Sequence, residues 1–169
     1  MTYNLFMKKI LILAALKLEI KNLITILAAK NDADIKKQNI FLAEKDNISY
    51  TIVHLGVGKN FLRNLKKLEL DNYAAVFLIG MAGSIKEKDV IGTLVFPEKI
   101  ISQQNIQPLF PSEKLIYLLN KKMPFGTLLC VNQVITKENK KKLAKEIDYI
   151  EMIGISFYQK PPTIFPVSS

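Results

Sequence analysis

Two segments of the sequence combine residue types that could act on a ligand. Glu19 stands between Leu18 and Ile20 on the first turns of a predicted helix, and Gly80-Met-Ala-Gly83 follows an apolar run. Glycines that flank a small residue let a ligand approach the backbone closely. Ligands of open α/β sheets bind at the carboxyl ends of the strands, and the Glu19 carboxylate could reach the same sheet edge as Gly80 to Gly83. From these residues alone, a solvated helix side chain and a plain turn remain the alternatives.

Three further residues carry groups that could be reactive. Glu151 directly follows a short apolar run, so its carboxylate could point into a cleft or bind the amides of the next helix. His54, the only histidine, has no Cys or His at ligand spacing, which predicts a core or edge-strand residue rather than a metal ligand. Cys130, the only cysteine, lies in an apolar run without a paired base and is not predicted to be a nucleophile. The sequence therefore predicts no metal site and no cofactor.

Long apolar runs must supply the elements that position these residues. The runs at 10–14, 74–79 and 126–131 predict strands buried on both faces, and we expect all three at the centre of one sheet. Apolar residues at helical spacing predict an amphipathic helix over 17–30. The alternation of strands and helices predicts an α/β fold, a single domain with a central, mostly parallel or mixed β-sheet flanked by helices.

Turn residues and shorter patterns predict the remaining elements. Strands over 39–43 and 48–55 flank the turn Lys45-Asp46-Asn47, and the strand over 92–102 carries Pro97, which favours an edge or a bulge. Gly56-Val-Gly58-Lys59 is too short for a phosphate-binding loop and is interpreted as the start of a second helix. We also expect a long strand over 126–135, short strands at 149–150 and 163–167, and helices at Ser112, over 137–146 and over 152–159.

Composition and charge narrow the function classes. The chain has 169 residues, 49% of them apolar and 23% charged, which is typical of one globular domain over 1–169, with 1–7 interpreted as a possible extension. The net charge of +9 comes from 23 lysines and only one arginine, Arg63, and this favours no nucleic-acid partner, because sequence-reading proteins depend on Arg. No run approaches 18 apolar residues, so we expect no membrane span and a cytoplasmic location.

In order and spacing, six segments resemble motifs of the nucleoside phosphorylase/nucleosidase superfamily. The resemblance runs from about Lys8 to the last residue and is closest to the methylthioadenosine/S-adenosylhomocysteine nucleosidases and to the hopanoid-associated phosphorylase-like branch. The segments are Lys9-Ile-Leu-Ile-Leu-Ala-Ala-Leu-Lys-Leu-Glu19, Gly56-Val-Gly-Lys59, Phe77-Leu-Ile-Gly-Met-Ala-Gly83, Ile91-Gly-Thr-Leu-Val-Phe-Pro97, Gly126-Thr-Leu-Leu-Cys-Val-Asn-Gln-Val-Ile135 and Ile150-Glu-Met-Ile-Gly154.

This resemblance implies a function and a set of site residues. It implies cleavage of the N-glycosidic bond of a purine nucleoside, a small-molecule substrate, a role in methionine salvage and a homo-oligomer, in particular a homodimer. Glu19 corresponds to the catalytic glutamate of the family. The substrate-binding positions implied by the resemblance are Met81, Ala82, Gly83, Val134, Ile135, Glu151 and Met152.

The sequence also departs from the family pattern. Ile153 stands where the family has the glutamate that binds the ribose hydroxyls, which would leave buried hydroxyls unpaired at roughly 1–3 kcal/mol each. Val134 replaces the aromatic residue that stacks on the base. The segment 164–169 stands near the family's last strand, without its catalytic aspartate, and the closing helix is missing, so the chain is interpreted as C-terminally truncated.

These departures leave two hypotheses open. The chain is either a nucleosidase, very slow or inactive on methylthioadenosine, or a degenerate homologue that binds a nucleoside-like ligand or a partner subunit. The sequence does not distinguish hydrolysis from phosphorolysis. Phosphorolysis needs a phosphate-binding site, and no arginine is placed to form one, because Arg63 lies in a predicted helix. We also expect apolar sheet surface left exposed by the missing helix to promote oligomerisation.

Overall fold

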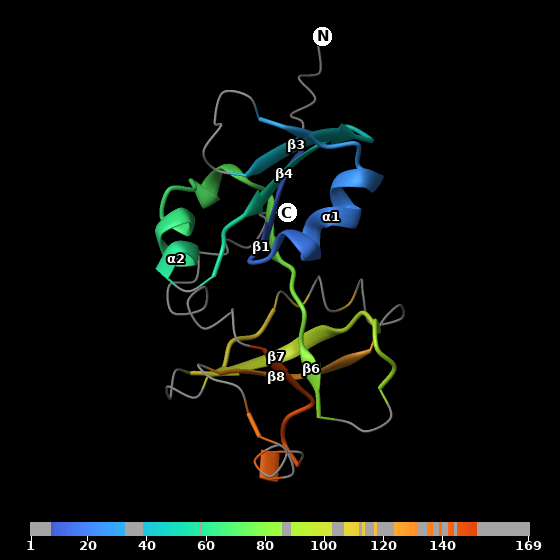
Figure 1. Cartoon of the computed structure of the whole chain (residues 1–169), viewed down its shortest axis with the longest axis vertical. Coiled ribbons are helices and arrows are strands. Elements are labelled where there is room, and N and C mark those ends of the chain that lie inside the picture. The colour runs from blue at the N-terminus through green and yellow to red at the C-terminus, as the bar shows by residue number, and fades with distance from the viewer. Residues whose placement is uncertain are drawn as a thin grey trace. The chain divides into compact units, whose positions relative to one another are not determined.

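The computed structural model describes residues 8–32, 39–57, 59–85, 89–102, 107–111, 113, 117, 124–131, 135–136, 139, 142–143 and 145–151. These residues form two compact units, the first ending at Gly80 and the second beginning at Met81 (Figure 1). Each unit has its own sheet. Among the described residues, no helix has the length and apolar character needed to cross a membrane.

The sheet of the first unit has five strands in the order β2-β3-β4-β1-β5. Strand β1 pairs in parallel with β4 and β5, and β3 pairs antiparallel with β2 and β4, so the sheet is mixed. Predicted strands over 10–14, 39–43, 48–55 and 74–79 are all present here. The strands are β1 (Lys8–Ala14), β2 (Lys30–Asn31), β3 (Ile40–Lys45), β4 (Ile48–His54) and β5 (Ala75–Leu78).

The core of the first unit forms where helix α1 (Lys17–Ile26) covers one face of this sheet. Ile20 packs with Ile12, Ala14 and Ile52 from β1 and β4, and these four residues are buried. On the other face of β1, Leu11 and Leu13 are fully buried. Burial on both faces explains why β1 has no polar alternation in its sequence.

Helix α1 ends earlier than its apolar periodicity predicts. The expected helix ran to residue 30, but the structure ends it at Ile26, and Ala28 adopts a left-handed backbone with φ 49°. The N–H of Ala29 donates to the Ile24 carbonyl at 2.9 Å and that of Ala28 to the Thr25 carbonyl at 3.1 Å, the bonding pattern of a Schellman motif. Because the left-handed position is alanine rather than glycine, no helix-stop residue marks this end in the sequence.

The β3–β4 hairpin closes through a two-residue turn. Asp46 and Asn47 have φ values of 54° and 61°, and Lys45 pairs with Ile48. Positive φ at both central residues is the signature of a type I′ turn, which suits the twist of a hairpin. The predicted turn is therefore confirmed. Helix α2 (Lys59–Leu65) starts where the sequence predicts, and a single 3-10 turn, η1 (Leu70–Asn72), precedes β5.

The second unit contains a four-stranded sheet in the order β6-β9-β8-β7. Strands β7, β8 and β9 run parallel, and β6 pairs antiparallel with β9. A buried cluster of Leu129, Val131, Ile147 and Ile150 forms its core. The strands are β6 (Gly83–Ser84), β7 (Phe96–Ser102), β8 (Phe125–Cys130) and β9 (Tyr149–Glu151).

Three strand predictions need correction in this unit. The run 126–131 forms β8 as predicted, but β8 belongs to the second sheet, so the expectation of one sheet shared with 10–14 and 74–79 is wrong. An apolar run indicates burial and does not specify which strand pairs with it. The predicted strand 126–135 ends at Cys130, and that over 92–102 begins only at Phe96.

Pro97 behaves as its chemistry predicts. Strand β7 is an edge strand, and its register with β8 shifts between Pro97 and Lys99. Proline has no N–H to donate to a ladder, so an edge and a bulge both accommodate it.

The α/β class with mixed sheets is as the sequence predicts. Predicted elements at Ser112, over 152–159 and over 163–167 lie outside the described residues, as does half of 137–146.

Candidate functional site

Glu19 is held at the end of β1 by the start of its own helix. Its Oε2 accepts hydrogen bonds from the backbone N–H groups of Leu16 at 2.9 Å and Ala15 at 3.1 Å. Leu16 is the extended N-cap residue, and Glu19 occupies the third helical position. This return bond is one half of a capping box, and the helix N-terminus favours a negative charge there. The carboxylate is therefore oriented by two backbone donors.

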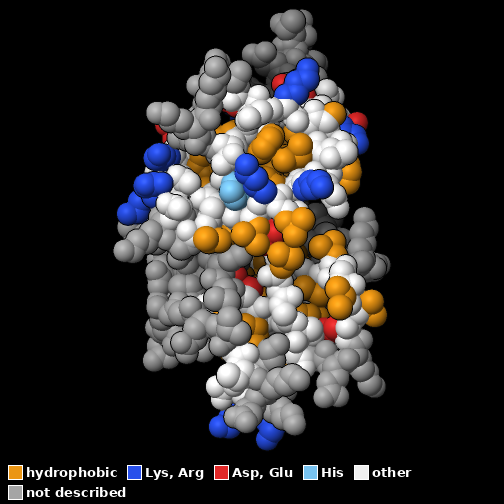
Figure 2. Space-filling model, viewed as in Figure 1, with side chains coloured by type: hydrophobic (Ala, Val, Ile, Leu, Met, Phe, Trp, Pro, Cys, Tyr) orange, Lys and Arg blue, Asp and Glu red, His pale blue; other side chains and the backbone are white. Residues whose placement is uncertain are grey.

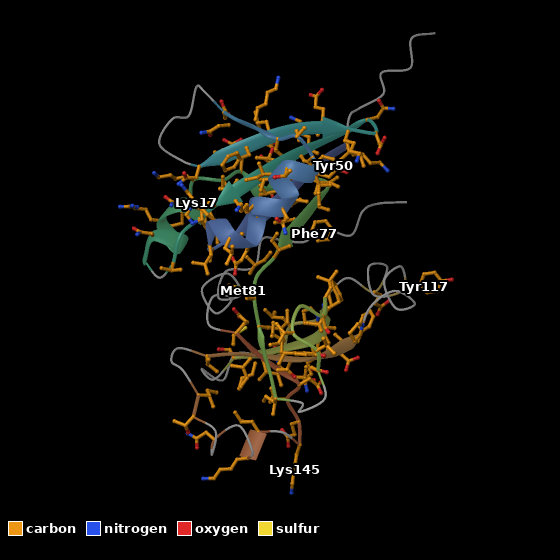
Figure 3. The ribbon with its side chains drawn as sticks, turned by 45° about the vertical axis from the view of Figure 1, so that its right-hand side comes forward. Lys17, Tyr50, Phe77, Met81, Tyr117 and Lys145 are labelled. Atoms are coloured by element: carbon orange, nitrogen blue, oxygen red, sulfur yellow. The ribbon has the colours of Figure 1, made fainter. Side chains whose placement is uncertain are left out.

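The second oxygen of Glu19 faces Gly80. Oε1 lies 3.4 Å from the position that a Cβ atom on Gly80 would occupy. Gly80 is in place because the Ile79 N–H donates to the Leu13 carbonyl at 2.9 Å, which continues the pairing of β5 with β1. The predicted approach of Glu19 to the end of the 74–79 strand is thus observed. Met81, labelled in Figure 3 where the chain leaves β5, directly follows Gly80.

His54 ends the strand on the other side of β1. It pairs in register with Ala14, and its backbone N–H donates to the Asn39 carbonyl at 3.1 Å. The side chain is half-buried in an interior strand, which resolves the core-or-edge alternative in favour of the interior. Its Nδ1 is buried and has no hydrogen-bond partner within the described ranges. In that part of the chain, no three His, Cys, Asp or Glu side chains gather in a way that could hold a metal ion.

In the second unit, the predicted substrate-binding segment begins on exposed backbone. Met81, Ala82 and Gly83 are all exposed, with Met81 at 56%. Gly83 pairs with Ile150 across β6 and β9, which fixes this segment beside the strand that ends in Glu151. Ile135 is partly buried against the Leu129 and Val131 cluster. Val134, Met152 and Ile153 lie outside the described residues.

Glu151 and Cys130 end neighbouring parallel strands and pair in register. Cys130 is fully buried, whereas Glu151 is half-buried, and the Val131 N–H donates to the Glu151 carbonyl at 2.9 Å. Burial raises the pKa of the Cys130 thiol far above its usual range, and the Glu151 charge and a hydrogen bond to that carboxylate raise it further. A thiol held in its neutral form is a poor nucleophile, which agrees with the sequence prediction.

Asp148 is a carboxylate that the sequence reasoning missed. Its Oδ2 accepts the Thr127 N–H at 2.7 Å, and its own N–H donates to the Thr127 carbonyl at 3.0 Å. A Cβ on Gly126 would lie 2.7 Å from that Oδ2, so only glycine lets the carboxylate reach the strand. The one available signal was a glycine at the start of an apolar strand, which often marks a close approach.

Apolar side chains are exposed on the second unit. Val90 is 75% exposed, Leu94 is 70% exposed and Ile91 is fully exposed. Figure 2 shows orange side chains at the surface of the region in which Figure 1 labels β6, β7 and β8. We call Val90, Ile91 and Leu94 the apolar loop patch. Exposed apolar patches commonly mark interaction sites.

Comparison with solved structures identifies the fold. A Helicobacter pylori 5′-methylthioadenosine/S-adenosylhomocysteine nucleosidase matches with a TM-score of 0.73 and 18% identity over 89% of this chain and 77% of the other. A mutant of the futalosine hydrolase of the same species matches with a TM-score of 0.73 and 20% identity, over 88% and 77%. The S. pneumoniae nucleosidase with a transition-state inhibitor matches with a TM-score of 0.74 and 17% identity, over 89% and 78%. No protein-family model and no curated protein sequence matches.

The chain thus has the fold of these methylthioadenosine/S-adenosylhomocysteine nucleosidases and of the futalosine hydrolase. The resemblance drawn from the six segments of the sequence is confirmed at the level of the fold. Sequence identity of 17–21% carries that likeness no further than the fold, so the chemistry must be argued from the residues of this chain.

Proposed function

We propose that this chain cleaves the N-glycosidic bond of a purine nucleoside, with hydrolysis as the reaction. The observation that carries the proposal is the Glu19 carboxylate, fixed by the N–H groups of Ala15 and Leu16 with its other oxygen against Gly80. Solved proteins of the same fold are nucleosidases and a futalosine hydrolase, which supports the reaction class. An oriented carboxylate at a strand end is what the attack of water on an anomeric carbon needs.

In this proposal Glu19 positions the attacking water and takes its proton as the bond to the base breaks. The transition state is oxocarbenium-like, so a carboxylate on the side of the water also favours the developing positive charge. The residue assignments from the resemblance are kept as part of the proposal. The substrate-binding residues would be Met81, Ala82, Gly83, Val134, Ile135, Glu151 and Met152.

The exposure of Met81, Ala82 and Gly83 supports a binding role, because a ligand can approach this segment from solvent. Glu151 would accept hydrogen bonds from ligand donors. Ile135 would contribute only the part of its side chain that the core leaves uncovered. Methylthioadenosine is the proposed substrate, in a methionine-salvage role in the cytoplasm.

A second candidate is a non-catalytic homologue that binds a nucleoside-like ligand or a partner subunit. Ile153 and Val134 favour it, since neither replaces the hydrogen bonds or the stacking of the family residues. The apolar loop patch supports a second copy of the chain, a homodimer, as the partner. The first candidate predicts nucleoside binding with turnover, whereas the ligand-binding form of the second predicts nucleoside binding without turnover.

Adenine release from methylthioadenosine by the purified chain tests the proposal. We expect slow release that falls by roughly 10²–10⁴-fold in Glu19→Gln, since this change removes a general base. Glu44→Gln is the matched control, because Glu44 is an exposed carboxylate on β3 of the same unit. Release unaffected by Glu19→Gln would indicate a contaminating enzyme and contradict the proposal. Binding without release would favour the second candidate.

A further inference from the structure

Three polar residues end the three parallel strands of the second sheet. Ser102 pairs with Cys130 across β7 and β8, and Cys130 pairs with Glu151 across β8 and β9. Side chains alternate between the two faces of a strand, and partners in register share a face. Ser102, Cys130 and Glu151 therefore form one row across the carboxyl ends of these strands, where ligands of α/β sheets bind.

The surroundings of this row are apolar. Buried Cys130 clusters with Ile100, and Leu109 and Leu128 pack against the pair. Glu151, on the same face of the adjacent strand, is only half-buried. A carboxylate in such a position needs a hydrogen-bond donor to settle in one orientation.

The Cys130 thiol is placed to be that donor. It stands at the paired position on the adjacent strand, on the same face of the sheet as Glu151, whose carboxylate raises the pKa of the thiol. Burial keeps the pKa of the thiol above its usual range, so the S–H proton stays in place to be donated. The backbone of Glu151 is fixed separately, through its carbonyl and the Val131 N–H at 2.9 Å. The backbone hydrogen bond thus fixes the main chain of Glu151, whereas the thiol would orient its carboxylate.

We propose that Cys130 is a positioning residue for Glu151: its thiol donates to the carboxylate and holds it on the face that Ser102 shares, where it accepts donors of a bound nucleoside. The ligand part of this inference rests on the proposed function. The contact between thiol and carboxylate does not, so the two parts can be tested separately.

Infrared spectroscopy tests the contact without any ligand. Cys130 is the only cysteine, so a single S–H stretching band reports on it. Donation to a carboxylate weakens the S–H bond, so we expect the band at a lower wavenumber in the unchanged chain than in Glu151→Gln. Glu98→Gln is the matched control, because Glu98 is an exposed carboxylate on β7. The same band position in all three proteins would overturn the proposal.

Calorimetric titration with methylthioadenosine tests the positioning role. Cys130→Val keeps the site filled without a donor, and we expect it to weaken binding about tenfold, the scale of one hydrogen bond to a charged group. Cys130→Ser keeps a donor, and we expect its affinity within about threefold of the unchanged chain. In a Glu151→Gln background, Cys130→Val should add no further loss, because the two residues act as one unit.

Two results would overturn the positioning role. In one, Cys130→Val binds methylthioadenosine as tightly as the unchanged chain. In the other, the loss of affinity caused by Cys130→Val adds in full to the loss caused by Glu151→Gln. Either result would mean that the cysteine only fills space. If the unchanged chain binds no methylthioadenosine while the S–H band still shifts in Glu151→Gln, the proposed function fails and the thiol–carboxylate contact stands.

Discussion

In each unit of the molecule a carboxylate lies against a glycine and accepts backbone N–H groups. In the first unit, Oε1 of Glu19 is 3.4 Å from the Cβ position of Gly80, an ordinary van der Waals distance. In the second, Oδ2 of Asp148 is 2.7 Å from the Cβ position of Gly126, where no Cβ atom fits. The Asp148–Gly126 pair of the second unit therefore leaves no room for a larger residue than glycine, and we call it the clamp. The Glu19–Gly80 pair of the first unit does leave room for a methyl group.

The two carboxylates have different roles: Asp148 stabilises the fold, whereas Glu19 is the candidate catalytic residue. Asp148 exchanges two hydrogen bonds with Thr127 and ties the loop before β9 to the start of β8. Oε2 of Glu19 accepts the N–H groups of Ala15 and Leu16, and Oε1 lies beside Gly80, the residue before the exposed 81–83 segment. A substitution at the clamp should therefore appear in stability, whereas one at Glu19 should appear in function.

Gly126→Ala should have the largest effect on stability. The new methyl group would meet Oδ2 of Asp148 and Cε2 of Tyr149, each at 2.7 Å. Overpacking costs about 1–3 kcal/mol, and a displaced Asp148 also loses a hydrogen bond of a charged group. We expect the free energy of unfolding, measured in urea, to fall by about 3 kcal/mol. An unchanged urea midpoint would show that the clamp is not tight.

Asp148→Ala should cost somewhat less, because it removes the hydrogen bond to Thr127 without adding a clash. We expect a loss of about 2 kcal/mol in the free energy of unfolding. Glu146→Ala is the matched control, since Glu146 is an exposed acid two residues earlier, and should change stability by less than about 0.5 kcal/mol. Equal losses in the two variants would contradict the structural role of Asp148.

Gly80→Ala should leave stability nearly unchanged, within about 1 kcal/mol, because the added methyl group finds ordinary contact distance. Under the proposed function it should instead slow adenine release about tenfold, because the methyl group occupies space beside Oε1 of Glu19 that the attacking water would use. Unfolding in urea and adenine release are measured on the same preparation. A large loss of stability with unchanged adenine release would mean that the Glu19–Gly80 pair stabilises the fold, as the Asp148–Gly126 pair does, and would contradict the proposed difference.

Ala28→Gly should have the smallest effect, and in the stabilising direction. The left-handed backbone of Ala28 costs about 1 kcal/mol, which glycine relieves in exchange for a more flexible unfolded chain. We expect the urea unfolding free energy to rise by about 0.5 kcal/mol. Ala29→Gly, at the next residue, should lower it instead, because Ala29 packs on the α1 core. A loss at position 28 would mean that the helix does not end there.

Local patterns were sufficient to predict strands and parts of the site. Apolar runs located β1, β5 and β8. The rule that ligands bind at strand ends predicted that Glu19 lies near Gly80, and the structure shows this. Pairings between distant segments were not predictable. The division into two sheets, the Asp148–Gly126 clamp and the Cys130–Glu151 contact each depend on which strands lie side by side, and neither partner alone carries that information.

The central claim is that Glu19 acts on the reacting bond while Glu151 holds the ligand. Calorimetric affinity for methylthioadenosine and the rate of adenine release, measured together on the unchanged chain, Glu19→Gln and Glu151→Gln, test it most directly. We predict that Glu19→Gln loses roughly 10²–10⁴-fold in rate with affinity within about threefold, and that Glu151→Gln weakens binding about tenfold. Glu19→Gln with unchanged release, or Glu151→Gln with unchanged affinity, would contradict this division of roles.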